Sequence, residues 1–153
     1  MKGDSALIPF YPSNINNLNR GAVIICPGGN LEYLHPREGT VVARWVAETL
    51  GIPAFVLRYR LLPDCDWSTM ISDFHKGVRL VRQHANGGPV VSFGFSAGGY
   101  LCSAAAATFP DKASRPDGLV RFFKCICIVL FFKRFESVTN SSHVLSLYIH
   151  TML

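Results

Sequence analysis

The sequence predicts an α/β fold in which helices cover both faces of a mainly parallel sheet, giving three layers. Three apolar runs of strand length, 22–26, 52–57 and 89–93, alternate with segments whose apolar residues recur at helical spacing. Strands and helices that alternate in this order form parallel sheets with right-handed crossovers. A chain of 153 residues that is 49% hydrophobic and 16% charged can bury one substantial core, so we expect one domain.

The first strand–helix unit begins with the unbroken apolar run 22–26. Such a run is typical of a strand that is buried on both faces, and the loop 27–30, Pro-Gly-Gly-Asn, ends it. A helix follows from Thr40, and Gly51 provides its C-terminal stop. The apolar residues that recur at helical spacing in it are Val42, Trp45, Val46 and Leu50.

The next two units repeat this order. Residues 52–57 form a second buried run, 58–66 are predicted to be a loop, and a second helix ends near 86–88, Asn-Gly-Gly. The inner face of that helix is marked by Met70, Ile71, Phe74, Val78 and Val81. The third strand, 89–93, leads directly into the most informative motif of the chain.

That motif is Gly94-Phe95-Ser96-Ala97-Gly98, placed between a strand and an alanine-rich helix. A serine at the tip of a tight strand-to-helix turn has a strained backbone and an exposed hydroxyl, and flanking glycines allow the strand and helix to approach each other. Ser96 is therefore the candidate nucleophile. The alternative interpretation is an ordinary glycine-rich turn before a helix.

Composition excludes several function classes. The net charge is +5, but nine basic and eight acidic residues precede residue 112, whereas six and two follow, so the body is nearly neutral. Without a basic stripe we predict no nucleic-acid partner. The N-terminus shows no signal peptide, which favours a cytoplasmic protein, and the apolar run 122–132 is too short to span a membrane. The five cysteines lack C-x-x-C spacing, so we predict no metal.

Four segments in order, 23–30, 38–45, 51–61 and 94–99, are similar to the α/β-hydrolase superfamily, most closely to its acetyl-xylan-esterase-like and feruloyl-esterase-like carboxylesterases. The resemblance covers about residues 20–118. It implies the α/β-hydrolase fold and a serine hydrolase without a cofactor. The implied substrate is a small-molecule carboxylic ester, typically a small acyl group on a sugar or a related alcohol.

The resemblance also implies an oxyanion hole, because acyl transfer needs N–H donors at the developing negative charge. The candidate donors are Ala97 and the loop residues Gly28, Gly29 and Asn30. The loop could instead be an ordinary turn. Further expectations are that Asp73 is structural and that the residues beside the loop line the pocket; these are Tyr33, His35 and Glu38.

A catalytic triad in this fold runs serine, acid, histidine along the chain. His143 and His150 are the histidines that follow Ser96, and His143 is the candidate base; a surface histidine is the other interpretation. We expect residues 1–118 to form the N-terminal part of a C-terminally incomplete hydrolase domain. Residues 119–153 are expected to be a divergent tail with one strand over 122–132. Two functional hypotheses remain open: an ester hydrolase, and an inactive chain without a working triad. A serine peptidase is a weaker third hypothesis.

Overall fold

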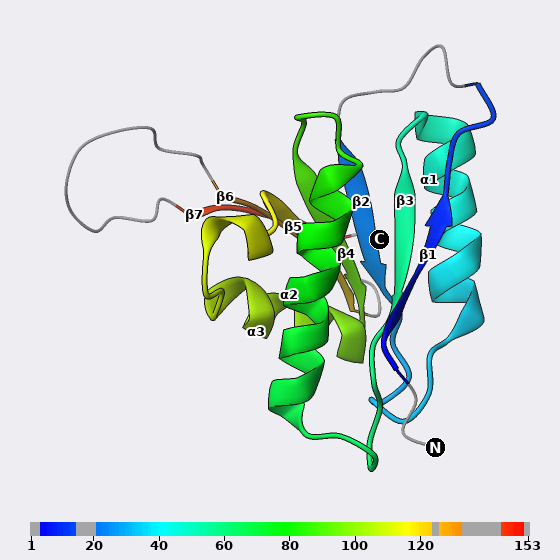
Figure 1. The fold of residues 1–153 in the computed structure, drawn as a ribbon. Helices are drawn as coiled ribbons and strands as arrows, with labels where there is room; N and C mark the ends of the chain where they lie inside the picture. The colour runs from blue at the N-terminus through cyan, green and yellow to red at the C-terminus, as the bar shows by residue number, and fades with distance from the viewer. Residues whose placement is uncertain (1–3, 15–20, 124–125, 133–144, 152–153) are drawn as a thin grey trace.

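The computed structural model describes residues 4–14, 21–123, 126–132 and 145–151. The described residues contain a mixed sheet of seven strands in the order β1-β3-β2-β4-β5-β6-β7 (Figure 1). In chain order the strands are β1 (Ala6–Phe10), β2 (Ala22–Cys26), β3 (Ala54–Arg58), β4 (Val90–Phe95), β5 (Gly118–Phe123), β6 (Ile126–Phe132) and β7 (Leu145–Thr151). The helices are α1 (Val42–Leu50), α2 (Trp67–Gln83) and α3 (Ala97–Ala107), with short turns η2 (Arg37–Val41) and η3 (Lys112–Ser114).

The four central strands, β3, β2, β4 and β5, run parallel to one another, as the alternation of strands and helices predicts. Strand β1 pairs antiparallel with β3, and β6 and β7 continue the sheet antiparallel beyond β5. Since β4 has β2 on one side and β5 on the other, its C-terminal end lies in the middle of the parallel part of the sheet.

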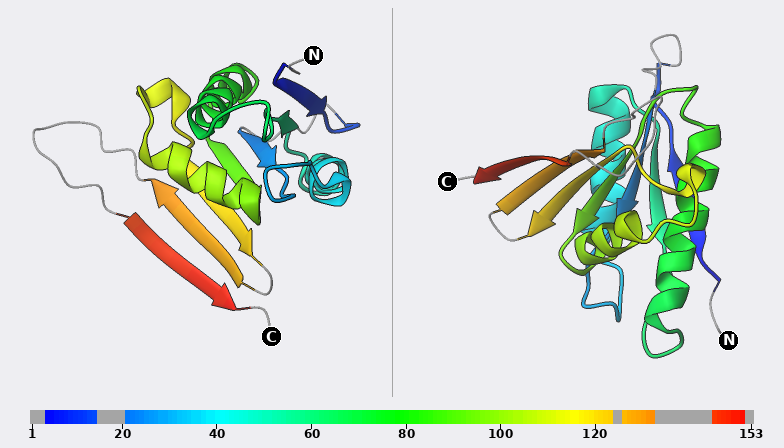
Figure 2. Two further views of the ribbon diagram at one scale, coloured as in Figure 1. Left: turned by 90° about the horizontal axis from the view of Figure 1, so that it is seen from below. Right: turned by 90° about the vertical axis from the view of Figure 1, so that its left-hand side faces the viewer.

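Helices cover both faces of the sheet: α2 and α3 lie on one face and α1 lies on the other (Figure 2). Successive residues of a strand point to opposite faces, and β2 shows this clearly. Ile24 packs with the core beneath α2 and α3, whereas Val23 and Ile25 pack with the core beneath α1. All five residues of β2 are buried, which explains the unbroken apolar run.

The helix boundaries follow from local chemistry. Gly51 ends α1 with φ 64°, a left-handed conformation that glycine adopts without steric cost. Asp66 caps α2 by accepting a hydrogen bond from the Thr69 N–H at 2.7 Å. The helix expected from Thr40 is preceded by the π-helical turn η2, so helical structure begins earlier than the apolar spacing indicates.

Two strand expectations require correction. Residues 118–132 form two antiparallel strands, β5 and β6, with Phe123 opposite Ile126, where the sequence indicated one strand over 122–132. Residues 119–132 contain no glycine or proline to mark a reversal. Strands β7 and β1 lie in regions where no strand was predicted, and β1 contains Pro9. Proline is tolerated there because β1 is an edge strand.

Candidate active site

Ser96 lies between the end of β4 and the start of α3, at the C-terminal edge of the sheet, as the sequence predicts. Its backbone has φ 47° and ψ −116°, a strained conformation for a residue with a side chain. Two hydrogen bonds hold the strained residue. The Ser96 N–H donates to the Phe122 carbonyl on β5 at 2.8 Å, and the Tyr100 N–H donates to the Ser96 carbonyl at 3.1 Å.

The two glycines of the motif allow the close approach of strand, helix and loop. A Cβ at Gly94 would lie 2.4 Å from the Cα of Gly99, inside the strand–helix turn. A Cβ at Gly98 would lie 2.2 Å from the Cys26 carbonyl oxygen, at the end of β2. Both contacts are with backbone atoms and both are far below van der Waals distance, so the elbow can form only with glycine at these positions.

The loop after β2 lies directly against Ser96. A Cβ at Gly28 would meet the Phe95 carbonyl oxygen at 2.7 Å and the Cβ of Ser96 at 3.0 Å. Beyond Gly28 the backbone has three successive positive φ angles, 131° at Gly29, 54° at Asn30 and 67° at Leu31. Ala97 and the predicted oxyanion loop are thus brought together at the candidate nucleophile, although they are about seventy residues apart in the chain.

The amides of this loop are not equivalent. The Gly28 N–H donates to Oε2 of Glu38 at 2.8 Å, so it is already engaged. The N–H groups of Gly29, Asn30 and Ala97 donate no hydrogen bond to any of the described residues. Ala97 is also the first residue of α3, where backbone N–H groups lack partners within the helix. These three amides are therefore the predicted donors that remain available to an anion.

Buried groups behind the loop do not compete with Ser96 as nucleophiles. Burial and a hydrogen bond with Cys102 raise the pKa of Cys26, so its thiol stays protonated at neutral pH. Burial also raises the pKa of Tyr59 above its usual range. The Tyr59 hydroxyl instead donates a hydrogen bond to the Pro27 carbonyl at 2.7 Å.

Of the histidines whose side chains the structure describes, His35, His75 and His84, none is hydrogen-bonded to the Ser96 hydroxyl. His143, the candidate base, lies outside the described residues. His35 follows the loop, donates its backbone N–H to the Gly28 carbonyl at 2.9 Å, and has a buried Nδ1 without a partner among the described residues. Asp73, expected to be structural, is buried and forms an ion pair with Arg60.

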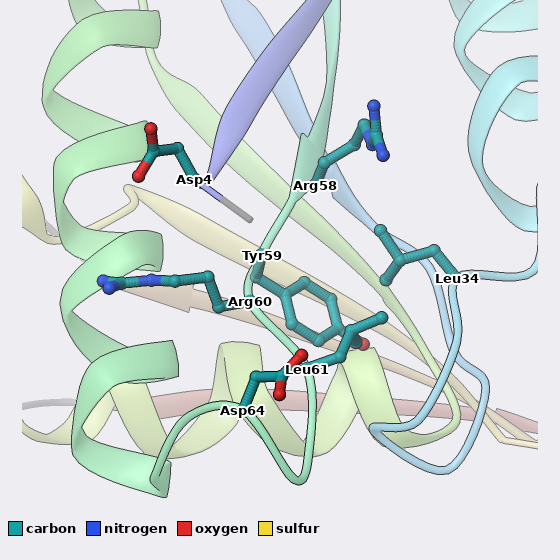
Figure 3. A pocket seen from close by; sticks show the side chains of 7 residues that line it. All are labelled: Asp4, Leu34, Arg58, Tyr59, Arg60, Leu61 and Asp64. Carbon is teal, nitrogen blue, oxygen red and sulfur yellow. The ribbon is translucent and has the colours of Figure 1, made fainter. Parts of the chain in front are cut away.

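A separate shallow pocket of about 170 Å³ lies at the C-terminal end of β3 (Figure 3). It is lined by Asp4, Leu34, Arg58, Tyr59, Arg60, Leu61 and Asp64. None of these residues belongs to the elbow, and Arg60, which lines the pocket, is paired with Asp73 on α2. This pocket therefore does not contain the candidate nucleophile.

Tyr59 was not singled out from the sequence, and Glu38 was expected only to line the pocket. Tyr59 directly follows β3, and a tyrosine at the end of a buried strand has an apolar ring for the core and a hydroxyl that needs a partner. The need of this hydroxyl for a hydrogen-bond partner is the signal by which the sequence could have pointed to Tyr59. The partner, a carbonyl thirty-two residues earlier, could not be found from local sequence.

The fold and the elbow define a class. A strained serine on a strand–turn–helix elbow, beside a glycine-rich loop at the C-terminal edge of a mostly parallel sheet, is the arrangement of a nucleophile elbow. Residues 24–143 match the family described as alpha/beta hydrolase fold, and the chain belongs to that family. Within the described residues no helix is long and apolar enough to cross a membrane.

Relatives of known activity support the same class. The chain is 32% identical over 130 residues to an acetylxylan esterase of Xylanibacter ruminicola, covering 81% of this chain and 26% of the relative. It is similar in structure to an acetyl ester-xyloside bifunctional hydrolase from Caldicellulosiruptor lactoaceticus, with 28% identity and a TM-score of 0.62 over 75% of this chain and 47% of that one. Esterase B from Lactobacillus rhamnosis matches at 30% identity with a TM-score of 0.57, over 65% of this chain and 34% of that one. The chain thus spans between a quarter and a half of these relatives.

Proposed function

We propose that this chain is a serine hydrolase of carboxylic esters, with Ser96 as the nucleophile. The observation that carries the proposal is the strained Ser96 backbone at a strand–helix turn, with the Gly28 loop in contact with its side chain. Strain of this kind persists only where the surrounding structure enforces it, and it clusters at functional sites.

In the proposed reaction the Ser96 Oγ attacks the ester carbonyl carbon while a base takes its proton. The carbonyl oxygen becomes an oxyanion, which accepts hydrogen bonds from the N–H groups of Ala97 and of Gly29 or Asn30. Collapse of this intermediate breaks the bond to the alcohol oxygen, which leaves as the protonated alcohol. Water then attacks the acyl-enzyme, releases the carboxylic acid and restores the Ser96 hydroxyl. His143 is the candidate base.

The proposed substrate is an ester of a small acyl group on a sugar or a related alcohol. Support comes from the relatives, since one is an acetylxylan esterase and another hydrolyses an acetyl ester. The mechanism requires no metal or cofactor. The second candidate function is an inactive chain that keeps the fold and the elbow without a working triad. The absence of a hydrogen-bonded histidine at Ser96 among the described residues favours it.

An active-site-directed phosphonate tests the nucleophile. Incubation with a fluorophosphonate should add one phosphonyl group per chain, and peptide mass spectrometry should locate it on Ser96. Ser96→Ala should lose the adduct completely. Ser103→Ala, on the same helix with its hydroxyl bonded to the Gly99 carbonyl, is the matched control and should keep it. No adduct, or an adduct on another residue, would contradict the proposal.

A further inference from the structure

We infer that Glu38 and Tyr59 are positioning residues that clamp one peptide group of the oxyanion loop. The inference rests on the proposed function, because it assigns a purpose to the loop beside Ser96. The peptide group is the one that joins Pro27 to Gly28. Its two polar atoms are held by side chains from two elements that are not adjacent in the sequence.

Both ends of this peptide are fixed. Its carbonyl, on Pro27, accepts a hydrogen bond from the Tyr59 hydroxyl at 2.7 Å, and its N–H, on Gly28, donates to Oε2 of Glu38 at 2.8 Å. Tyr59 follows β3 and is 2% exposed, whereas Glu38 lies on η2 and is half-buried. The bond to a carboxylate is charge-assisted and is therefore stronger than a bond between neutral groups. A peptide held at both ends cannot rotate without breaking two hydrogen bonds.

The clamped peptide touches the elbow. A Cβ at Gly98 would lie 2.5 Å from the Pro27 carbonyl oxygen, so the start of α3 packs against that carbonyl. The position at which Gly28 would carry a Cβ is 2.9 Å from Oε2 of Glu38 and 3.0 Å from the Cβ of Ser96. The Glu38 carboxylate and the Ser96 side chain therefore flank the same glycine. Any movement of this peptide is transmitted to the nucleophile.

The clamp also decides which amides can meet an oxyanion. With the Gly28 N–H turned to Glu38, the next peptide groups along the loop are set by the positive φ angles of Gly29 and Asn30. A positive φ angle is energetically unfavourable for Asn30, which carries a side chain. Hydrogen bonds from residues outside the loop are therefore needed to hold this conformation. Oxyanion stabilisation depends on donors that are already in place before reaction. Glu38 and Tyr59 thus supply preorganisation without contacting substrate.

The test compares Glu38→Ala, Glu38→Gln, Tyr59→Phe and Glu32→Ala with the native chain in turnover of p-nitrophenyl acetate. Glu38→Ala should lower kcat roughly 10–100-fold and change KM less than about twofold, because only the transition state needs the donors in place. Glu38→Gln should recover most of the loss, because its amide oxygen can accept the Gly28 N–H. Glu32→Ala is the matched control: Glu32 is exposed in the same loop region and should behave as native.

A double variant separates the clamp from two independent effects. Because Glu38 and Tyr59 hold the same peptide, Glu38→Ala with Tyr59→Phe should lose less activity than the product of the two single losses. Hydrogen exchange followed by NMR should show that the Gly28 amide loses protection in Glu38→Ala and regains it in Glu38→Gln. Turnover and hydrogen exchange are both measured at temperatures below the unfolding transition of each variant, where the variant is folded.

The failures are distinguishable. If the native chain shows no turnover that depends on Ser96, the proposed function is wrong and the purpose assigned to the clamp falls with it. If the native chain is active and Glu38→Ala matches Glu32→Ala, the positioning role is overturned while the function stands. Loss confined to KM, no recovery in Glu38→Gln, or full additivity in the double variant would also overturn it.

Discussion

Asp73 carries its charge inside the protein. Its side chain accepts hydrogen bonds from the backbone N–H, Nε and Nη2 of Arg60 at 3.1, 2.9 and 2.7 Å. Burial by itself would raise the pKa of this carboxyl, but the bonds from Arg60 outweigh it and the pKa is lowered from its usual value. A lowered pKa in the folded state means that the ionised form stabilises the fold. This stabilisation is complete above the ordinary carboxyl pKa and disappears as the pH falls through the lowered value.

Replacing Asp73 with Asn should therefore destabilise the protein by about 2–4 kcal/mol at pH 7, because the partly exposed Arg60 loses its buried partner. The difference from the native chain should begin to shrink as the pH falls below about 4, the ordinary carboxyl pKa, and should disappear only below the lowered pKa of the folded protein. Urea unfolding of the native chain and of Asp73→Asn at pH 7 and pH 3 measures the loss of stability and its dependence on pH. Asp111→Asn is the control: its ion pair with Arg79 is exposed, so it should cost less than about 1 kcal/mol. A constant Asp73→Asn effect across this pH range would contradict the argument.

Among the elements, helix α3 depends on backbone contacts that no side chain could replace. At Gly98 the positions of the Cys26 and Pro27 carbonyls leave no space for a methyl group. Gly77 on α2 is different, because a Cβ there meets only the ends of flexible side chains, Ile24 Cδ1 at 3.0 Å and Leu57 Cδ1 at 3.2 Å. Both Gly77 and Gly98 lie in helices. They differ in their neighbours, which are backbone carbonyls at Gly98 and the ends of side chains at Gly77.

Gly98→Ala should lower the free energy of unfolding by more than about 2 kcal/mol, because α3 must move away from the end of β2. Gly77→Ala should change it by less than about 1 kcal/mol, since small shifts of Ile24 and Leu57 are offset by the better helix propensity of alanine. Equilibrium urea unfolding of both variants makes the comparison. Similar losses in the two variants would show that the backbone contact at Gly98 is not the determining feature.

The elements that the sequence predicts well are those with a strong period and a clear stop. Helix α1 ends at Gly51, and β2 is a continuous apolar run before Pro27, so their positions follow from local residues. The reversal between β5 and β6 was missed because no glycine or proline in residues 119–132 marks it. Strand β1 was not predicted. It contains Pro9, which is compatible with a strand only at a sheet edge, and edge position is a property of the assembled sheet.

At the scale of the whole molecule, the sequence locates the candidate nucleophile and the loop beside it but not the groups that hold them. Ser96 and the Gly28–Asn30 loop are predicted because each depends on a local motif. The Tyr59–Pro27 and Glu38–Gly28 bonds depend on how β3 and η2 pack beside the loop, which no spacing rule encodes. Gly28 was one of the four predicted oxyanion donors, but its N–H donates to Glu38, so the candidate donors are now Gly29, Asn30 and Ala97.

Turnover by the 153-residue chain tests the molecule as a whole. We expect weak hydrolysis of p-nitrophenyl acetate, because the proposed oxyanion donors would stabilise the transition state while none of His35, His75 and His84 is hydrogen-bonded to Ser96. In serine hydrolases without a working triad, roughly 10³–10⁴-fold acceleration over water remains from the oxyanion hole and binding.

The variants Ser96→Ala and His143→Ala decide between the two functions. Weak turnover that persists unchanged in His143→Ala would match the chain without a working triad. Robust turnover, abolished by Ser96→Ala and by His143→Ala alike, would contradict our expectation and establish His143 as the base. His84→Ala is the control for general loss of a histidine, because His84 lies at the end of α2 against Tyr11, on an element that takes no part in the elbow.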